Sequence, residues 1–523
     1  MRHSLPRRKV AGIPSVCVLL VGAAFAAPAQ AADLPPFTKA PPQMMSSWTG
    51  FYAGLGLGLR ATDADLTTTS AQRDGVPLDL SRSVVTQPFD GTGFRVSPYA
   101  GFNWHVAPSW VVGVEGDVGL ADQTTRLGGF RSSPLFASST FNVDGLAVKT
   151  SWDASLRGRV GYLVTPATLL YATGGLAWQH YEITSTCVSI DCGGVTPTVV
   201  SNSTTKTGWT LGGGLETALS GNWLLRAEYR YADFGTAPFT ITRMTARPTT
   251  TTDNFDARLA THTASVGLAY KFGEPVIGGR SQPLQAMAAQ PSSWTGAYVG
   301  LGLGARATRT DLIAASESVG GSATDLADRA NTRPFDNIAF RANPYAGYLW
   351  QFAPLWTAGV EGDFGFADRT TTRAGFTSIL LADSQAPGES LAIRSRWDAS
   401  LRARLGYLVG LQTMLYATGG AAWQNAQMTS TCTSGPCTGF FALSPGVVSS
   451  STTKTGWTAG GGLETVLWGN WLARAEYRYA DYGKASFIVA RSSTSPGLNP
   501  VVNTWDVAMR SHLATFGVTY RFE

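Results

Sequence analysis

The chain has 523 residues, with 40 Lys and Arg against 35 Asp and Glu and only 14% charged residues. Residues 1–31 hold four of the bases and no acid, so the rest of the chain carries 36 bases and 35 acids, a net charge of +1. This balance gives no support to nucleic-acid binding. After residue 31, no apolar run reaches the roughly 18 residues that a transmembrane helix needs.

The N-terminus has the pattern of a secretory signal peptide. A basic segment at residues 2–9 precedes an apolar stretch at 10–27, and residues 29–31 read Ala-Gln-Ala, the small-x-small pattern that signal peptidase recognises. Pro14 argues against a transmembrane anchor, and no lipobox precedes Cys17. We expect cleavage after Ala31 and export through the inner membrane.

The exported part is duplicated. Ser47–Gly50 recurs as Ser293–Gly296, an offset of 246 residues, and Arg226–Asp233 recurs as Arg474–Asp481. A repeat of this length is a duplicated domain, because solenoid periods are only about 20–50 residues. The predicted organisation is a signal peptide at 1–31, a periplasmic linker at 32–46, a first domain at 47–273, a second periplasmic linker at 274–292 and a second domain at 293–523.

Within each copy, polar and apolar residues alternate with a period of two. In residues 111–122, for example, Glu115 and Asp117 lie on one face and Val114 and Val118 on the other. Such alternation predicts strands. The eight strands expected in the first copy begin near Phe51, Phe94, Trp110, Lys149, Leu169, Thr205, Trp223 and His262.

Short and long connections alternate between these strands. Short ones are expected at residues 105–109, 165–168 and 220–222, and long Thr- and Ser-rich loops at about 62–93, 122–148, 185–204 and 234–261. This layout is typical of outer-membrane barrels, whose long loops lie outside the cell. The fold class predicted is therefore all-β: two tandem eight-stranded, antiparallel, up-and-down transmembrane β-barrels with periplasmic ends.

If the apolar faces contact lipid, the charged faces line the lumen. Eight strands enclose a space just wide enough for side chains, and an unpaired buried charge costs several kcal/mol, so the charges must pair. The predicted salt-bridge network comprises Glu115, Asp117, Arg157, Arg159, Glu216, Arg226, Glu228 and Arg230 in the first copy and Glu361, Asp363, Arg402, Arg404, Glu464, Arg474, Glu476 and Arg478 in the second. Aromatic residues near both ends of the strands predict membrane-interface girdles.

Two cysteine pairs lie in polar, turn-rich stretches. In an exported protein, Cys187 with Cys192 and Cys432 with Cys437 are expected to form two loop disulfides. A zinc site shared by the two pairs is an alternative, but no histidine lies near them. We expect neither a metal nor a cofactor.

Two patterns invite a catalytic interpretation. Glu115 with Asp117, and the equivalent pair in the second copy, have a spacing that could serve acid–base chemistry, but arginines on neighbouring strands favour a structural ion-pair network. His262 lies near Ser265, as in barrel-rim lipid-modifying enzymes, yet the second copy has Thr515 at the serine position. We therefore expect no catalytic residues and no enzyme.

Three segments of the first copy, Trp48–Gly54, Tyr171–Gly175 and Ala227–Tyr231, resemble the small outer-membrane β-barrel family of alphaproteobacteria. This family comprises porin-like and immunogenic surface proteins and is distantly similar to the OmpA membrane domain. The resemblance covers each copy from end to end. It implies an eight-stranded barrel in the outer membrane that contributes to envelope integrity and surface exposure. The chain departs from the pattern in having two barrels and in ending on Glu523 after the aromatic Phe522.

Three functions are compatible with this organisation: a structural surface protein, a porin, and a lipid-modifying enzyme. The porin would conduct through small pores or through one merged sixteen-stranded barrel. The balanced lumen charge and the linker of about 20 residues between the copies favour the first. The expected partners are outer-membrane lipids, the barrel-assembly machinery during insertion, and an unidentified surface ligand of the loops, with no nucleic acid among them.

Overall fold

The computed structural model describes residues 47–80, 86–128, 145–187, 198–219, 221–244, 250–276, 293–319, 321–325, 333–374, 389–409, 412–433, 444–492 and 500–522. The predicted signal peptide with Cys17, the first linker, nearly all of the second linker, Cys192, Cys437 and Glu523 lie outside these residues. In the part of the chain that is described, no helix is long and apolar enough to cross a membrane.

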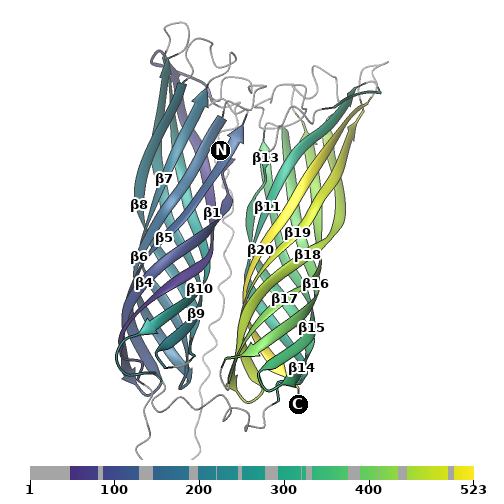
Figure 1. Cartoon of the computed structure of the whole chain (residues 1–523). Coiled ribbons are helices and arrows are strands. Elements are labelled where there is room, and N and C mark those ends of the chain that lie inside the picture. The colour runs from purple at the N-terminus through teal and green to yellow at the C-terminus, as the bar shows by residue number, and fades with distance from the viewer. Residues whose placement is uncertain are drawn as a thin grey trace, which may run out of the picture. The chain divides into compact units, whose positions relative to one another are not determined.

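The first copy forms a closed antiparallel ring of eight long strands (Figure 1). Each strand pairs with its neighbours in chain order, and β1 pairs with β10 from Tyr52↔Lys271 to Arg73↔Thr251, which closes the ring. The strands are β1 (Gly50–Arg73), β4 (Gly91–Ala107), β5 (Trp110–Gly128), β6 (Gly145–Thr165), β7 (Thr168–Cys187), β8 (Thr198–Ala218), β9 (Trp223–Met244) and β10 (Thr250–Lys271). Two short strands, β2 (Val76–Pro77) and β3 (Thr86–Pro88), also pair with β1.

The second copy forms a ring of its own. Its long strands are β11 (Gly296–Val319), β14 (Asn337–Ala353), β15 (Trp356–Ala374), β16 (Glu389–Leu408), β17 (Thr413–Cys432), β18 (Gly446–Trp468), β19 (Trp471–Arg491) and β20 (Val501–Arg521), with short β12 (Ser322–Asp325) and β13 (Arg333–Pro334) on β11. β11 pairs with β20. Because each copy closes on itself, the two-barrel prediction is confirmed, and the alternative of one merged sixteen-stranded barrel is wrong.

Each barrel has an apolar band on its outer surface. The band starts at the end where tight turns join the strands, the short-turn end, and extends along β5 from Trp110 to Leu120. Leu156 and Leu211 are each 58% exposed on the protein surface, as expected for side chains that face lipid in a membrane. About 9–11 residues of a tilted strand span a bilayer, so this band has the length of a membrane span.

The long strands have 17 to 24 residues and continue beyond the band towards the opposite end, the loop end. There the inner face of the barrel becomes apolar and the outer face becomes polar. Phe239 pairs with Phe255 in register, and both side chains are buried inside the barrel, whereas the neighbouring Thr240 and Asn254 face outwards and hydrogen-bond to each other at 2.7 Å. The loop end of the barrel therefore has the apolar interior and polar exterior of a water-soluble protein.

This exchange corrects the predicted loops. Much of residues 62–93, 122–148, 185–204 and 234–261 continues the strands, so β6, β8 and β10 begin at Gly145, Thr198 and Thr250, well before the predicted starts. The period of two persists in these stretches, but their polar residues face solvent rather than the lumen. Their high Thr and Ser content therefore belongs to strand positions that face solvent and not to loops.

β-bulges lie at the edge of the apolar band. The register of β5 with β6 shifts between Leu120 and Gln123, and that of β9 with β10 shifts between Arg258 and Ala260. At the second bulge, Gly235 has a φ of 64°, a conformation that favours glycine. An extra residue in one strand changes which residues face inwards and increases the local twist. On β9 the buried positions accordingly change from Phe234 to Ala237 and Phe239.

Candidate functional site

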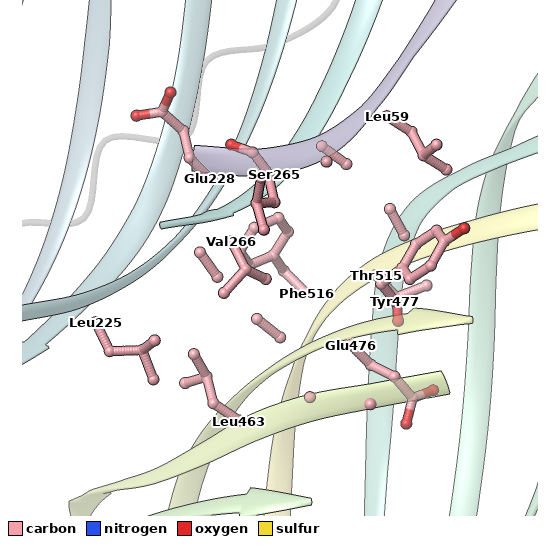
Figure 2. A pocket seen from close by; sticks show the side chains of 18 of the residues that line it. Leu59, Leu225, Glu228, Ser265, Val266, Leu463, Glu476, Tyr477, Thr515 and Phe516 are labelled. Atoms are coloured by element: carbon pink, nitrogen blue, oxygen red, sulfur yellow. The ribbon is translucent and has the colours of Figure 1, made fainter. Parts of the chain in front are cut away.

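The charged side chains gather in one layer of the lumen, at the level of the apolar band. All eight residues of the network predicted for the first barrel point inwards and are at most 7% exposed. Figure 2 shows the underlying alternation from close by: in the first barrel Glu228 points away from Val266, and in the second Glu476 points away from Phe516. The alternation of side chains on a strand thus separates the charged layer from the lipid-facing surface.

In the first barrel, two acidic residues organise the layer. Glu115 accepts hydrogen bonds from Arg157 and Arg226, and from the hydroxyl of Tyr52 at 2.7 Å. Asp117 accepts two hydrogen bonds from Arg230, at 2.8 and 2.9 Å. These contacts join side chains that are separated by up to 113 residues in the sequence.

Two further acids complete the pairing of the arginines. Glu228 accepts from Arg157 at 2.9 Å, and Glu216 accepts from Arg159 at 3.4 Å. Glu216 is fully buried. Each of the four arginines therefore has at least one carboxylate partner on another strand, across the lumen or beside it.

The second barrel repeats the layer with its own variations. Arg474 donates two hydrogen bonds to Glu361, at 2.6 and 2.8 Å, and Arg402 also donates to this acid. Arg404 lies 3.0 Å from Glu361 and 3.0 Å from Glu464. The other acids pair as well: Arg478 with Asp363 at 2.7 Å and Arg402 with Glu476 at 3.1 Å.

Sequence reasoning missed three charged members of each layer. In the first barrel, Asp153 accepts from Arg60 at 2.8 Å and from Arg95, which also donates to Asp117 at 2.6 Å. The equivalents in the second barrel are Arg306, Arg341 and Asp398. Each layer thus contains six arginines and five acids, so the predicted balance of four and four is wrong. These residues occupy strand positions whose side chains point into the lumen, and the same residue types recur in both copies. These two features together could have identified them from the sequence.

Tyrosines fill the space between the charges. In the first barrel, the guanidinium of Arg226 lies 3.7 Å from the ring centroid of Tyr99, and that of Arg159 lies 4.1 Å from that of Tyr171. Such stacking holds a guanidinium in a fixed plane. Gly54 makes room for this packing, since a Cβ there would lie 2.6 Å from the Tyr99 ring.

A tryptophan lies at the short-turn end of each lumen. Trp48 precedes β1, is fully buried, and donates from Nε1 to the carbonyl of Pro166 at 3.2 Å. It packs with Tyr52, Leu169 and Leu224 in an apolar cluster. Trp294 takes the same position in the second barrel and is 2% exposed.

A Pro-Phe-Asp segment lies in the loop end of each barrel and was also missed from the sequence. Phe89 is buried in the apolar interior, and its backbone N–H donates to the carbonyl of Ala64 at 2.6 Å. Asp90 returns a bond, because its Oδ1 accepts from the backbone N–H of Ala64 at 3.1 Å. The segment after β1 is thereby fastened back onto β1, with Phe89 inside the barrel.

The second copy repeats this arrangement with Phe335 and Asp336 on Thr310. Burial raises the pKa of the Asp336 carboxyl to about 7. Burial also raises the pKa of Asp90 well above its usual range, and the nearby Asp63 carboxylate adds to this effect. Both aspartates lie towards the loop end, beyond the apolar band.

The geometry does not favour acid–base chemistry in the charged layer. Both oxygens of Glu115 and both oxygens of Asp117 accept hydrogen bonds from arginine, tyrosine or serine side chains. His262 faces outwards, with Nδ1 2.7 Å from the Tyr229 hydroxyl, whereas Ser265 lies three residues later on β10 and therefore on the opposite face. The two do not form a dyad.

The remaining predicted sites fall at the margin of what the structure describes. Cys187 ends β7 and Cys432 ends β17. Because Cys192 and Cys437 lie outside the described residues, the two loop disulfides stay a prediction. Among the described residues there is no group of three or more His, Cys, Asp or Glu that could hold a metal ion.

Comparison with known proteins identifies the family. Residues 17–272 and 283–522 each match the outer membrane protein beta-barrel domain. The chain belongs to this family. Up to 49% of its length is similar to proteins of alphaproteobacteria, as the resemblance implied. The 31 kDa outer-membrane immunogenic protein of Brucella melitensis is 31% identical over 271 residues, which cover 49% of this chain and 99% of that protein.

Two smaller relatives agree with this assignment. The 25 kDa outer-membrane immunogenic protein of Brucella abortus is 29% identical over 226 residues, covering 43% of this chain and 80% of its own length. The 22 kDa outer membrane protein of Rhizobium leguminosarum is 29% identical over 196 residues, covering 38% and 69%. This chain is thus an outer-membrane β-barrel protein that carries the family's domain twice.

Proposed function

We propose that the chain is a structural and surface-display protein of the cell envelope, not a channel or an enzyme. Its two barrels anchor it in the outer membrane, and the loop ends project outside the cell and carry the loops. Both termini of each barrel domain then lie in the periplasm, after export and removal of the signal peptide. The expected contacts are outer-membrane lipids, the barrel-assembly machinery during insertion, and an unidentified surface ligand of the loops.

The observation that carries this proposal is the filling of each lumen along its length. Trp48 or Trp294 lies at the short-turn end, the arginine–carboxylate layer follows, and an apolar interior with Phe89 or Phe335 occupies the loop end. Arg157 and its equivalent Arg402 are both 2% exposed in the middle of this column. A conducting pore needs a continuous path of water, which such packing interrupts three times.

The absence of catalysis is part of the same proposal. Two sequence patterns suggested catalysis. The paired carboxylates are fully engaged in hydrogen bonds with neighbouring side chains, and the histidine and the nearby serine lie on opposite faces of β10. The apolar interior of the loop end gives the projecting part a core of its own. This core lets the loops be displayed on a rigid support beyond the membrane surface.

Single-channel recording tests the proposal. The refolded mature protein is inserted into planar bilayers, and we expect silence or rare, small flickers. Large, steady steps in conductance would contradict the filled-lumen interpretation and would favour the alternative function, a porin with small pores.

A positive control shows that silence does not arise from failed insertion. Replacing a whole ion pair in each barrel, Arg159→Ala with Glu216→Ala and Arg404→Ala with Glu464→Ala, removes charges without leaving one unpaired. We expect this variant to insert equally well, judged by protease protection in vesicles, and to conduct more often than the parent. A parent that conducts as well as this variant would also refute the proposal.

A further inference from the structure

The second barrel differs from the first on its outer surface, at the edge of the apolar band. All eleven inward charged residues of the central layer are identical in type between the copies, as Arg60 with Arg306 and Asp153 with Asp398 illustrate. On the outward faces, however, four positions that hold Asp63, Lys149, Ser151 and Ala260 in the first copy hold Arg309, Arg394, Arg396 and Arg510 in the second. The formal charge of these four positions changes from zero to +4.

Two arginines of this set, Arg309 and Arg510, face each other on neighbouring strands. Arg309 on β11 and Arg510 on β20 are direct cross-strand partners, with side chains 53% and 44% exposed. Like charges placed directly opposite are unfavourable. The nearest carboxylates are those of the half-buried Asp311, 3.8 Å from Arg309, and Asp481, 3.5 Å from Arg510; because both arginine side chains are about half exposed, these ion pairs contribute little stability.

The other two arginines lie two residues apart on β16, on its outward face. Arg394 donates two hydrogen bonds to Asp368, of which the one from Nε measures 2.6 Å. Arg396 is exposed and has no hydrogen bond or ion pair with the described residues of its barrel. The register of β16 shifts between Ser395 and Asp398, so Arg396 lies in a β-bulge close to Arg394, and the side chains of both residues are open to solvent. The two guanidinium groups can therefore contact one multiply charged anion.

Both arginine pairs lie at the edge of an aromatic girdle, one just beyond it along the strand and the other in register with it. Trp397 pairs in register with Phe366, and Arg396 and Arg394 follow immediately towards the loop end. Likewise Asp481, the cross-strand partner of Arg510, pairs with Trp457. Because exposed Trp and aromatic residues mark the membrane–water interface, the next residues along the strands lie at the level of the lipid head groups.

We propose that these two arginine pairs make the second barrel a binding surface for the phosphate groups of outer-leaflet lipid. Arginine forms short, charge-assisted and often bidentate hydrogen bonds with phosphate. The first barrel, with Asp63 and Ala260 in place of one pair, lacks the surface. Duplication thereby yields one barrel that holds phosphorylated lipid and one that does not. The inference rests on the outer-membrane assignment and is independent of whether the lumens conduct.

The test measures displacement of a fluorescent, diphosphorylated lipid A from the refolded full chain in detergent, against its dephosphorylated form. We expect at least about tenfold tighter binding of the phosphorylated lipid, weakened by added salt. Converting the second copy to first-copy residues, Arg309→Asp, Arg510→Ala, Arg394→Lys and Arg396→Ser, should abolish this preference. The converse substitutions Lys149→Arg and Ser151→Arg should increase phosphorylated-lipid binding.

A matched control removes bases that belong to the first barrel. Arg126→Thr and Arg258→Ala introduce the residues that the second copy has at these positions, and they should leave lipid binding unchanged. Each variant is checked for correct folding by whether it keeps the gel mobility of the folded protein. The two arginine pairs are also replaced one pair at a time. Equal affinity for both lipid forms, or full phosphate preference in the exchanged variant, would overturn the proposal. Displacement by inorganic phosphate at a similar phosphate concentration would also overturn it, because it would assign the surface to soluble anions.

Discussion

Removal of one acid from the charged layer provides a strong test of the filled lumen. In Glu115→Gln, the carboxylate that accepts from Arg157 and Arg226 becomes a neutral amide. Arg157 retains Glu228 at 2.9 Å, but the nearest remaining carboxylate for Arg226 is the same Glu228, at 3.9 Å. Breaking a buried ion pair by removing one partner costs about 3–5 kcal/mol. We expect a loss of this size in the unfolding free energy of the first barrel.

The size of this loss depends on whether water reaches the lumen. In a water-filled channel, Arg226 would remain solvated after the substitution, and the cost would be about that of an exposed ion pair, under about 1 kcal/mol. A second variant, Glu115→Gln with Arg226→Met, removes the orphaned charge and should recover most of the loss, because replacing a buried pair by apolar groups is often close to neutral. A filled lumen therefore predicts that the double variant is more stable than the single variant.

Urea unfolding in lipid vesicles measures both variants. Urea leaves electrostatic interactions unscreened, and folded and unfolded barrels separate by gel mobility. Glu361→Gln in the second barrel serves as the matched comparison, since Glu361 accepts from Arg402, Arg404 and Arg474. A single-variant loss below about 1 kcal/mol, or a double variant no more stable than the single, would refute the dry, side-chain-filled interpretation.

Three further outcomes are expected. Trp48→Ala should destabilise the first barrel by about 3–5 kcal/mol, measured by the same unfolding assay, whereas Trp104→Ala on the exposed outer surface should cost clearly less in detergent. Because burial raises the folded-state pKa of Asp336 to about 7, its protonated form contributes stability that is full below about pH 4 and is lost as the pH rises through 7. The protection of the amides near Thr310 from hydrogen exchange, measured relative to their intrinsic exchange rates, should thus fall from pH 5 to 8, and Asp336→Asn should abolish this fall in protection. Mass spectrometry of the unreduced mature chain should find peptides linking Cys187 to Cys192 and Cys432 to Cys437, and detection of free thiols at these positions would contradict the loop disulfides.

The membrane-level half of each barrel was accessible from the sequence because one rule governs it. There, side chains alternate between lipid and lumen, so Glu115, Arg157 and Arg226 could be assigned to one face from their parity alone. Duplication reinforced the assignment, since the same pattern recurs at Glu361, Arg402 and Arg474.

The loop-end half was misassigned because the same alternation has the opposite meaning beyond the bilayer. Phe239 and Phe255 point inwards there, while the polar residues between them face water. Period alone does not indicate which face meets which solvent, and bulges such as the one at Gly235 change the parity within a strand. The Pro-Phe-Asp segment was invisible for a different reason: its role depends on a turn back onto Ala64, a contact that strand periodicity does not encode.

The two copies together show where physical constraint acts on this fold. An inward arginine such as Arg95 contacts acids on two other strands, so replacing it would leave both Asp117 and Asp153 short of a partner at once. An outward residue such as Asp63 meets solvent or head groups, where exchange for Arg309 costs little. In a water-filled lumen, inward charges would be nearly as exchangeable as outward ones. The identity of all eleven central charges, beside the exchange of Asp63 for arginine, therefore argues for interlocked, desolvated pairs inside and leaves the outer surface as the place where the two barrels acquired different roles.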